Sequence, residues 1–208
     1  DIQYFKGSKM TLFCRGTAGN NRIQAENVFP WDETIRMDGF AGNDHLVGAF
    51  LHRNDIFGGT GNDTLQGGSA VNLLDGGDGN DILNAWLGGY STLRGGAGND
   101  HLTGGNGGNL LDGGLGNDTM IGGDGGDIYV VNSVLDVIQE SYVPYFDNDP
   151  NPRDLVQSHI NWTVGAFLED LTLMGTGAIN GTGNGLANVI TGNAGNNTLL
   201  GAAGADTL

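Results

Sequence analysis

The 208-residue chain has little cysteine, little proline and few basic residues. Its single cysteine, Cys14, excludes an intramolecular disulfide framework. We expect this thiol to be a small buried hydrophobe, with an intermolecular bridge as the less favoured alternative. No apolar stretch approaches the ~18 residues of a membrane-spanning helix, and no cleavable signal peptide is recognisable. Because the first residue is Asp1, we expect a processed or excised piece of a longer protein.

The few basic residues are also unevenly placed. The chain carries 8 Lys and Arg against 24 Asp and Glu, a net charge of −16. Residues 1–53 hold six basic and six acidic groups, so the whole net charge lies in the remainder. A chain of this charge would be repelled by a phosphate backbone, which excludes nucleic acid as the default partner.

Glutamate is scarce as well, and glycine is abundant. Only 4 of the 24 acidic residues are Glu, whereas 40 residues are Gly, roughly a fifth of the chain against the usual ~7%. A tight loop that places a short carboxylate beside its own carbonyls favours Asp over Glu, and it favours Gly wherever the backbone needs a positive φ. The composition therefore indicates many similar acidic loops.

Five aspartates stand in one register, spaced 19, 18, 19 and 18 residues apart, and each is preceded by Gly-x-x-Gly-Asn. They are Asp44, Asp63, Asp81, Asp100 and Asp118. Two residues after each aspartate comes an apolar residue, in turn Leu46, Leu65, Leu83, Leu102 and Met120. A flexible acidic linker would have no reason to keep that apolar position, so the repeat predicts a folded structure.

The repeating unit is a nonapeptide of the form G-G-x-G-x-D-x-U-x, where U is apolar. Its six Gly-rich residues predict a turn, and its last three predict a short strand whose central side chain points inward. Two units make one coil, so stacked coils align loops of one kind along one edge. Between two stacked loops we expect a cage of backbone carbonyls and two carboxylates. These are hard oxygen ligands, which suit Ca²⁺ far better than Zn²⁺ or Cu²⁺.

The alternate nonapeptides are poorer in acid. Their residues at the carboxylate position are Asp55, Asn72, Ser91, Asn109 and Asp127. We therefore expect one fully acidic edge, one depleted edge and a strongly asymmetric distribution of calcium. At the ninth position of the same units, Asp75, Arg94 and Asp112 are expected to form a surface ladder of alternating charge between coils.

The repeat divides the chain into four predicted segments of one elongated domain. Residues 1–38 form an N-terminal cap or junction that includes a nonapeptide with Asn21 in place of Asp, and residues 39–130 form the regular roll. Period-two apolar alternation in residues 131–178 predicts coils of a wider parallel β-helix without metal loops. In residues 179–208 the nonapeptide returns with Asn at most carboxylate positions, so we expect amide hydrogen bonds to hold these loops.

These motifs resemble the RTX (repeats-in-toxin) calcium-binding nonapeptide proteins, the haemolysin-type calcium-binding region, over residues 39–130 and 183–208. The resemblance implies an all-β fold, a right-handed parallel β-roll or β-helix solenoid with calcium-binding Gly-Asp loops. It also implies a secreted bacterial protein, exported by a type I system, that folds when it meets extracellular Ca²⁺.

The resemblance further implies a set of ligands. In the family one loop supplies its second and fourth carbonyls, the next coil supplies its first and third, and both supply the sixth-position Asp. Carried onto matching positions, the calcium-binding residues are Phe40, Gly42, Asp44, Gly58, Gly59, Thr60, Gly61, Asp63, Gly76, Gly77, Asp78, Gly79, Asp81, Gly95, Gly96, Ala97, Gly98, Asp100, Gly113, Leu115, Asp118 and Asp127. Phe40 stands where the family has Gly.

Other chemistry finds little support. We expect no catalytic residues, because there is no H-E-x-x-H zinc motif and no G-x-S-x-G elbow, and the glycine string 181–186 fails the dinucleotide fingerprint. The four histidines are expected on the surface.

Residues 147–151 begin like an EF-hand loop, but Pro152 stands where Gly is required, so a solvated acidic loop is favoured over a separate calcium site. Tyr129, Trp86 and Trp162 are expected in core or edge packing, with a carbohydrate platform as the alternative.

Three functions from different classes remain. The first is a non-catalytic calcium-binding roll of a secreted or cell-surface protein, whose metal-free chain is largely disordered and which serves as a folding switch and rigid spacer. The second is an extracellular filament or surface-layer subunit that polymerises through its roll ends. The third is the export module of an enzyme whose catalytic part lies elsewhere.

Overall fold

The computed structural model describes residues 2–3, 11–25, 34–87, 89–140 and 153–208, and these form strands without any helix. The strands are β1 (Ile2–Gln3), β2 (Thr11–Arg15), β3 (Arg22–Gln24), β4 (Thr34–Ala41), β5 (His45–Val47), β6 (Arg53–Thr60), β7 (Thr64–Gln66), β8 (Asn72–Asp78), β9 (Ile82–Asn84), β10 (Thr92–Ala97), β11 (His101–Asn106), β12 (Leu110–Leu115), β13 (Thr119–Asp124), β14 (Ile128–Val131), β15 (Val137–Gln139), β16 (Leu155–Ser158), β17 (Trp162–Thr163), β18 (Asp170–Leu173), β19 (Gly181–Thr182), β20 (Val189–Thr191) and β21 (Leu199–Leu200).

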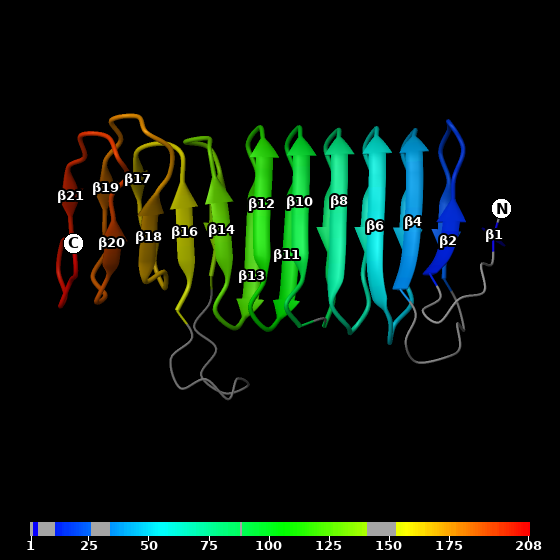
Figure 1. The fold of residues 1–208 in the computed structure, drawn as a ribbon, viewed down its shortest axis with the longest axis horizontal. Helices are drawn as coiled ribbons and strands as arrows, with labels where there is room; N and C mark the ends of the chain where they lie inside the picture. Colours follow the sequence, from blue (N-terminus) through cyan, green and yellow to red (C-terminus); the bar gives the residue numbers. More distant parts are fainter. Residues whose placement is uncertain (1, 4–10, 26–33, 88, 141–152) are drawn as a thin grey trace.

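The strands form a β-solenoid in which each strand pairs with strands one coil away. One sheet has the order β1-β2-β4-β6-β8-β10-β12-β14-β16-β18-β20, a second has β15-β13-β11-β9-β7-β5-β3, and a third has β17-β19-β21. Pairing is parallel throughout these sheets except between β1 and β2. The strands of the first sheet stand side by side along the length of the molecule, with the two chain ends at opposite ends (Figure 1). The all-β parallel solenoid expected from the repeat is confirmed.

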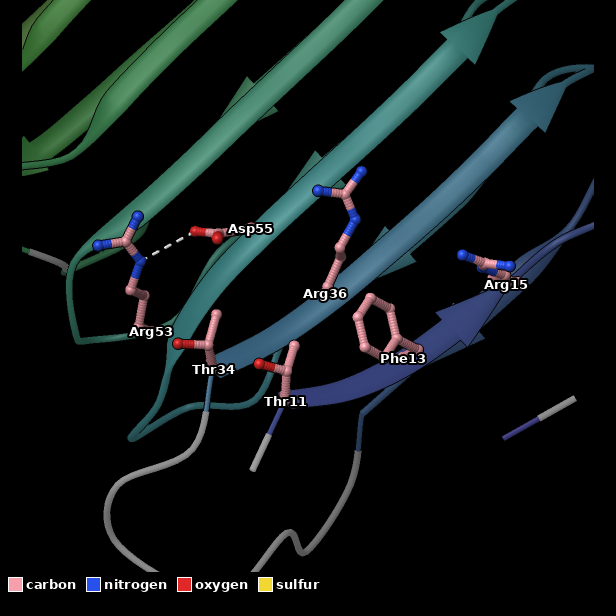
Figure 2. A pocket seen from close by; sticks show the side chains of 7 residues that line it. All are labelled: Thr11, Phe13, Arg15, Thr34, Arg36, Arg53 and Asp55. Carbon is pink, nitrogen blue, oxygen red and sulfur yellow. Dashed lines mark hydrogen bonds and ion pairs between the residues drawn. The ribbon is translucent and has the colours of Figure 1, made fainter. Parts of the chain in front are cut away.

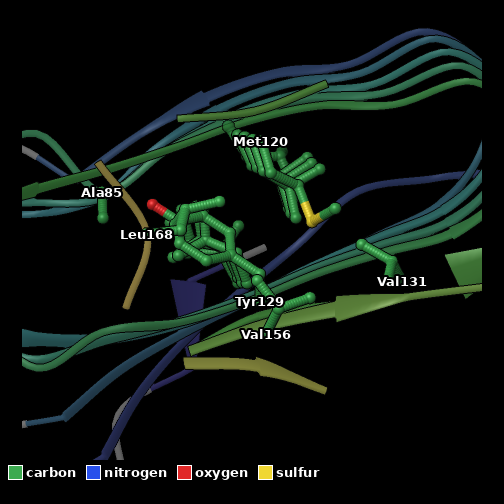
Figure 3. Packing of buried hydrophobic residues seen from close by; sticks show 14 of the residues in the cluster. Ala85, Met120, Tyr129, Val131, Val156 and Leu168 are labelled. Atoms are coloured by element: carbon green, nitrogen blue, oxygen red, sulfur yellow. The ribbon is translucent and has the colours of Figure 1, made fainter. Parts of the chain in front are cut away.

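The core is a double column of stacked side chains, one column from each main sheet. The seven-stranded sheet contributes the apolar residues that follow the five aspartates, and all are fully buried: Leu46, Leu65, Leu83, Leu102 and Met120. The first sheet contributes a second column, also fully buried: Ile56, Leu74, Leu93, Leu111 and Tyr129. Figure 3 shows Tyr129 of this column opposite Met120 of the other. Each such burial contributes about 1.5–3 kcal/mol. A single coil cannot bury its own apolar face, so this contribution depends on stacking.

Coil length is regular only in the roll. From Asp44 to Asp136, hydrogen bonds between successive coils join residues 18 or 19 positions apart. On the opposite edge the next hydrogen bond of this kind joins Asp127 and Asp154, so that coil is 27 residues long. The following one joins Asp154 and Glu169, so the next coil is only 15 residues long. The coils within residues 131–178 therefore differ in length from each other and from those of the roll. Strand pairing fixes only the paired residues, and the connections between them vary in length.

Several smaller expectations can be compared with the structure. Cys14 is buried in the core, as expected, and burial raises the pKa of its thiol. Arg94 pairs in register with Asp75 on one side and Asp112 on the other, so the register expected for the outer ladder is present. Residues 147–151, whose sequence begins like an EF-hand loop, lie outside the described residues.

The aromatic residues divide between core and surface. Tyr129 is fully buried and Trp162 packs against the core, as expected for structural aromatics. Trp86 is half-exposed in the turn after β9. His45 and His101 lie in one outward column of the seven-stranded sheet, on the same face as Thr64.

Candidate metal centre

The five register aspartates line one edge of the solenoid. Each ends a Gly-rich turn and directly precedes a strand of the seven-stranded sheet. All five are 1–3% exposed: Asp44, Asp63, Asp81, Asp100 and Asp118. A continuous column of buried carboxylates runs along this edge, which we call the first edge.

Positive backbone angles bring these turns close together. Gly59 and Gly61 have φ of 113° and 118°, and a Cβ at either would overlap a carbonyl oxygen of the preceding loop. Glycine is therefore required for conformation and for space. Phe40 occupies the position equivalent to Gly59 and adopts φ of 77°, so a positive φ is kept at this position despite the side chain.

One oxygen of each carboxylate joins neighbouring coils. Asp63 Oδ1 accepts a hydrogen bond from the backbone N–H of Asp44 at 2.7 Å, and Asp81 Oδ1 accepts one from Asp63 at 2.7 Å. The same bond recurs from Asp81 to Asp100 at 2.8 Å and from Asp100 to Asp118 at 2.9 Å. These bonds fix each carboxylate and orient its second oxygen.

The second oxygen, Oδ2, is buried and has no hydrogen-bond partner among the described residues in any of the five aspartates. A methyl group on Gly58 would overlap Asp63 Oδ2 and also crowd the carbonyl oxygen of Gly76 on the next coil, so both oxygens point to one spot. The same pairing of Oδ2 with a next-coil carbonyl recurs at Gly39, Gly76 and Gly95. Buried polar atoms are normally satisfied, so this convergence of orphaned hard oxygens has the chemistry of a calcium site.

The raised pKa values of these aspartates also favour a bound cation. Burial is the main cause that raises the pKa of Asp63, Asp81 and Asp100 to about 6, with repulsion between neighbouring carboxylates adding to it. The backbone hydrogen bonds on Oδ1 oppose this shift but do not cancel it. Burial likewise raises the pKa of Asp118. A stack of buried carboxylates is costly to ionise unless a cation offsets the charge.

The column ends in residues that need no cation. At one end Asn21 takes the aspartate position and donates its backbone N–H to Asp44 Oδ1 at 2.6 Å. At the other end Asp136 Oδ1 accepts from Asp118, while its Oδ2 accepts from the backbone of Asn132 and Ser133 at 3.0 and 2.9 Å. The sequence reasoning missed this role of Asp136, although its 18-residue spacing from Asp118 was the available signal.

The opposite, second edge is satisfied mainly by uncharged side chains. Asn54 and Asn72 are buried, and Asn54 Nδ2 donates to Asn72 Oδ1 at 2.9 Å. Ser91 accepts from Asn72 and donates its N–H to Asn109 Oδ1 at 2.9 Å. The predicted depletion of carboxylates along this edge is present.

One predicted member of that edge is wrong. Asn54, not Asp55, pairs with Asn72 in the buried column. Asp55 lies one residue later, and since strand side chains alternate between faces it points outward, where it binds Arg53 at 3.0 Å. Asp127 does stand in the column, where its Oδ2 is again buried without a partner among the described residues. Burial is the main cause that raises its pKa to about 8.

The asparagine before each register aspartate forms an outer ladder that sequence reasoning also missed. Asn43 Oδ1 accepts from the N–H of Asn62 at 2.9 Å, and Asn62 Oδ1 accepts from Asn80 at 2.8 Å. The pattern continues through Asn99 to Asn117. The invariant Asn of the repeat thus holds the loops together outside the aspartate column.

Three arginines of the N-terminal coils line a groove on the outer face of the first sheet. Its lining is Thr11, Phe13, Arg15, Thr34, Arg36, Arg53 and Asp55 (Figure 2). Arg53 binds Asp55, Arg36 binds Asp38 at 2.9 Å, and the Arg36 guanidinium also lies over the Phe57 ring at 4.3 Å. The groove is therefore a mixed surface with internal ion pairs rather than a concentrated positive patch. In the described part of the chain no helix has the length and apolarity of a membrane span.

Comparison with protein families matches the RTX calcium-binding nonapeptide repeat, in four copies, over residues 57–91, 94–129 and 182–208. No curated protein and no solved structure matches the chain. The matched segments include the loops of Asp63, Asp81, Asp100 and Asp118. The Phe40 loop precedes them.

Proposed function

We propose that this chain, which carries RTX calcium-binding nonapeptide repeats, is a non-catalytic calcium-dependent folding switch and rigid spacer in a secreted protein. The observation that carries the proposal is the row of five orphaned Oδ2 atoms on the first edge, of which those of Asp44, Asp63, Asp81 and Asp100 lie beside a carbonyl oxygen of the next coil. The repeat and the parallel solenoid fit a calcium-binding structural domain.

The proposed ligands are the carboxylates of the register aspartates and the carbonyls of the loops between them. In the first cage these are Asp44 and Asp63 with the carbonyls of Phe40, Gly42, Gly58 and Thr60. The equivalent loop residues listed above serve the following cages. Bound calcium would supply the positive charge that lets stacked carboxylates remain ionised while buried.

Folding is proposed to depend on calcium because the metal-free chain opposes its own collapse. The chain carries a net charge of −16 and contains 40 glycines, which lose much conformational entropy when ordered. Cation binding offsets the repulsion and adds its binding free energy to folding. A protein exported unfolded would then become rigid on reaching a calcium-rich exterior.

The location of the ions tests the proposal. Five stacked aspartate loops enclose four gaps, so we expect at least four ions in a line between Asp44 and Asp118. Anomalous diffraction from crystals grown with calcium would locate them. Ions found mainly beside Asn72, Ser91 and Asn109 would refute the assignment.

A calcium titration followed by circular dichroism tests the switch. We expect β-structure to appear on calcium addition and to disappear on chelation. A chain that stays fully folded in chelator would contradict calcium-triggered folding. Mass measured in the same titration separates a monomeric spacer from the alternative of an end-to-end filament, which would grow with calcium and concentration.

A further inference from the structure

Three carboxylates converge where the regular roll passes into the longest coil of the first sheet. Asp127 directly precedes β14, Glu140 directly follows β15 and Asp154 directly precedes β16. One ligand oxygen from each lies within 4.8 Å of the others. Asp127 is 0% exposed, Asp154 is 8% exposed and Glu140 is half-buried. They belong to the second edge, apart from the row of register aspartates.

Backbone hydrogen bonds hold two of these carboxylates in place. Asp127 Oδ1 accepts from the N–H of Asn109 at 2.5 Å and from Asn109 Nδ2 at 3.1 Å. Asp154 Oδ1 accepts from the N–H of Asp127 at 2.7 Å. Asp127 Oδ2 is fully buried and has no hydrogen-bond partner within the described ranges. The buried orphan oxygen therefore belongs to the residue at the centre of the cluster.

Gly122 shows where that oxygen points. A Cβ on Gly122 would overlap three oxygens at once: Asp127 Oδ2, Glu140 Oε1 and the Tyr129 hydroxyl. The Tyr129 hydroxyl donates a hydrogen bond to Glu140 Oε1. Oxygens from three different strands or turns thus share one small space beside a residue without a side chain.

Among the described residues, neither the Tyr129 hydroxyl nor the Arg153 guanidinium balances the charge of these three carboxylates. A single tyrosine hydroxyl donates one proton and cannot balance three carboxylates. Arg153, adjacent to Asp154 in sequence, directs its Nε to Asp170 at 3.1 Å and its Nη2 to the Ala187 carbonyl at 3.2 Å. Three converging hard oxygens with a net negative charge match the preference of Ca²⁺ for carboxylate ligands.

We propose that Asp127, Glu140 and Asp154 bind one calcium ion at this junction, with the Tyr129 hydroxyl as an accessory oxygen. The site differs from the loop cages because Glu140 lies outside any nonapeptide and Asp154 comes from the following long coil. A calcium ion at this site would join Asp127 to Asp154, which lie 27 residues apart on successive coils, and so would hold the C-terminal coils against the roll. The loop cages on the first edge cannot do this, since their column ends at Asp136.

Calcium counting by native mass spectrometry of the full chain tests the site. Glu140→Gln keeps the shape and the acceptor for Tyr129 but removes one charge, and we expect it to bind one ion fewer than the wild type. Asp112→Asn is the matched control, since it removes one carboxylate from the outer face of β12, one coil away from β14. It should keep the full count. Equal counts for wild type and Glu140→Gln would overturn the proposal.

A terbium measurement gives a second readout that does not require a carboxylate variant. Tb³⁺ bound beside Tyr129 should emit when tyrosine is excited, and Tyr129→Phe should remove most of that emission while keeping all three carboxylates. Unchanged emission in Tyr129→Phe would place the ion elsewhere. If Glu140→Gln fails to fold with calcium, this measurement alone decides between the two outcomes.

The result is separable from that of the loop cages. A chain that binds a single ion, lost in Glu140→Gln, would support this site and contradict the row of cages. A chain that binds at least four ions and loses none in Glu140→Gln would support the cages and contradict this site.

Discussion

The two edges of the solenoid differ in how the buried polar side chains of their loops are satisfied. On both, a polar side chain at the sixth position of the loop accepts a hydrogen bond from the neighbouring coil. On the first edge that side chain is Asp, whose remaining oxygen is left without a protein partner. On the second it is mostly Asn or Ser; Asn72, for example, donates to the carbonyls of Gly68 and Ala70. We therefore expect the first edge to need a cation, whereas the side chains of most of the second edge find hydrogen-bond partners within the protein.

The largest test of this difference compares one residue from each edge. Asp81→Ala removes a carboxylate that faces two cages, so we expect the calcium midpoint of folding to rise by about tenfold or more, roughly 1.4 kcal/mol. Asn72→Ala removes buried hydrogen bonds and should cost about 1–3 kcal/mol at every calcium concentration. Calcium titrations combined with urea unfolding measure both effects. Equal shifts in the calcium midpoint would break the distinction between the edges.

Lowering the pH should stabilise the metal-free fold and destabilise the calcium-loaded fold. The folded-state pKa of Asp63, Asp81 and Asp100 is raised to about 6 from 3.8. Protonation therefore favours the metal-free fold, whose stability from these groups is full below pH about 4 and is lost as pH rises to about 6. Calcium competes with the same protons, so its affinity should fall as pH drops below about 6. Circular dichroism in chelator, which reports the folded fraction, and urea midpoints in saturating calcium, both measured across this pH range, give the two slopes. Slopes of the same sign would contradict the assignment.

A smaller effect is expected at the start of the first edge. Phe40 holds φ of 77°, a left-handed conformation that costs a residue with a Cβ roughly 1–2 kcal/mol. Its side chain is half-exposed, so little packing is lost on truncation. Phe40→Gly should therefore stabilise the calcium-loaded chain by about 1 kcal/mol, as read from urea unfolding. Phe57→Gly, a control in the same sheet, should not stabilise, because Phe57 is not among the residues with positive φ and packs against Arg36.

The smallest loss of stability is expected for a substitution on the outer face of the first sheet, which belongs to neither edge. Arg94 is exposed and lies in register between Asp75 and Asp112. An exposed pair contributes roughly 0.2–1 kcal/mol, so Arg94→Ala should weaken folding only slightly and less so at high salt. A loss several times larger in the urea midpoint would show that Arg94 has another role.

Much of the first edge could be predicted because its spacing equals one coil. A period of 18 or 19 residues places Asp63 beside Asp81 and Leu65 beside Leu83, whatever the details of the turns. The second edge was harder to predict. Asn54 and Asp55 are both polar neighbours at the start of a strand, and only the pairing of Asn54 with Asn72 shows which one faces inward.

The proposed calcium ligands also divide into those that the sequence indicated and those that only the structure brought together. The sequence indicated Asp44 through Asp118 and Asp127 as calcium ligands, and these remain proposals supported by their orphaned oxygens. It did not indicate that Glu140 and Asp154 approach Asp127, because 27 residues separate the two aspartates and no repeat relates them.

By itself the sequence determined the repeating coil, the aspartate column and the apolar column two residues after it, because a strict period leaves one way to bury the apolar face of every coil. The tertiary structure alone decided the inward residue at the start of β6, the coils of 27 and 15 residues, and the convergence of carboxylates beside Gly122. The physical reason is that strand pairing constrains the paired residues, whereas irregular connections are set by what the completed stack allows them to contact.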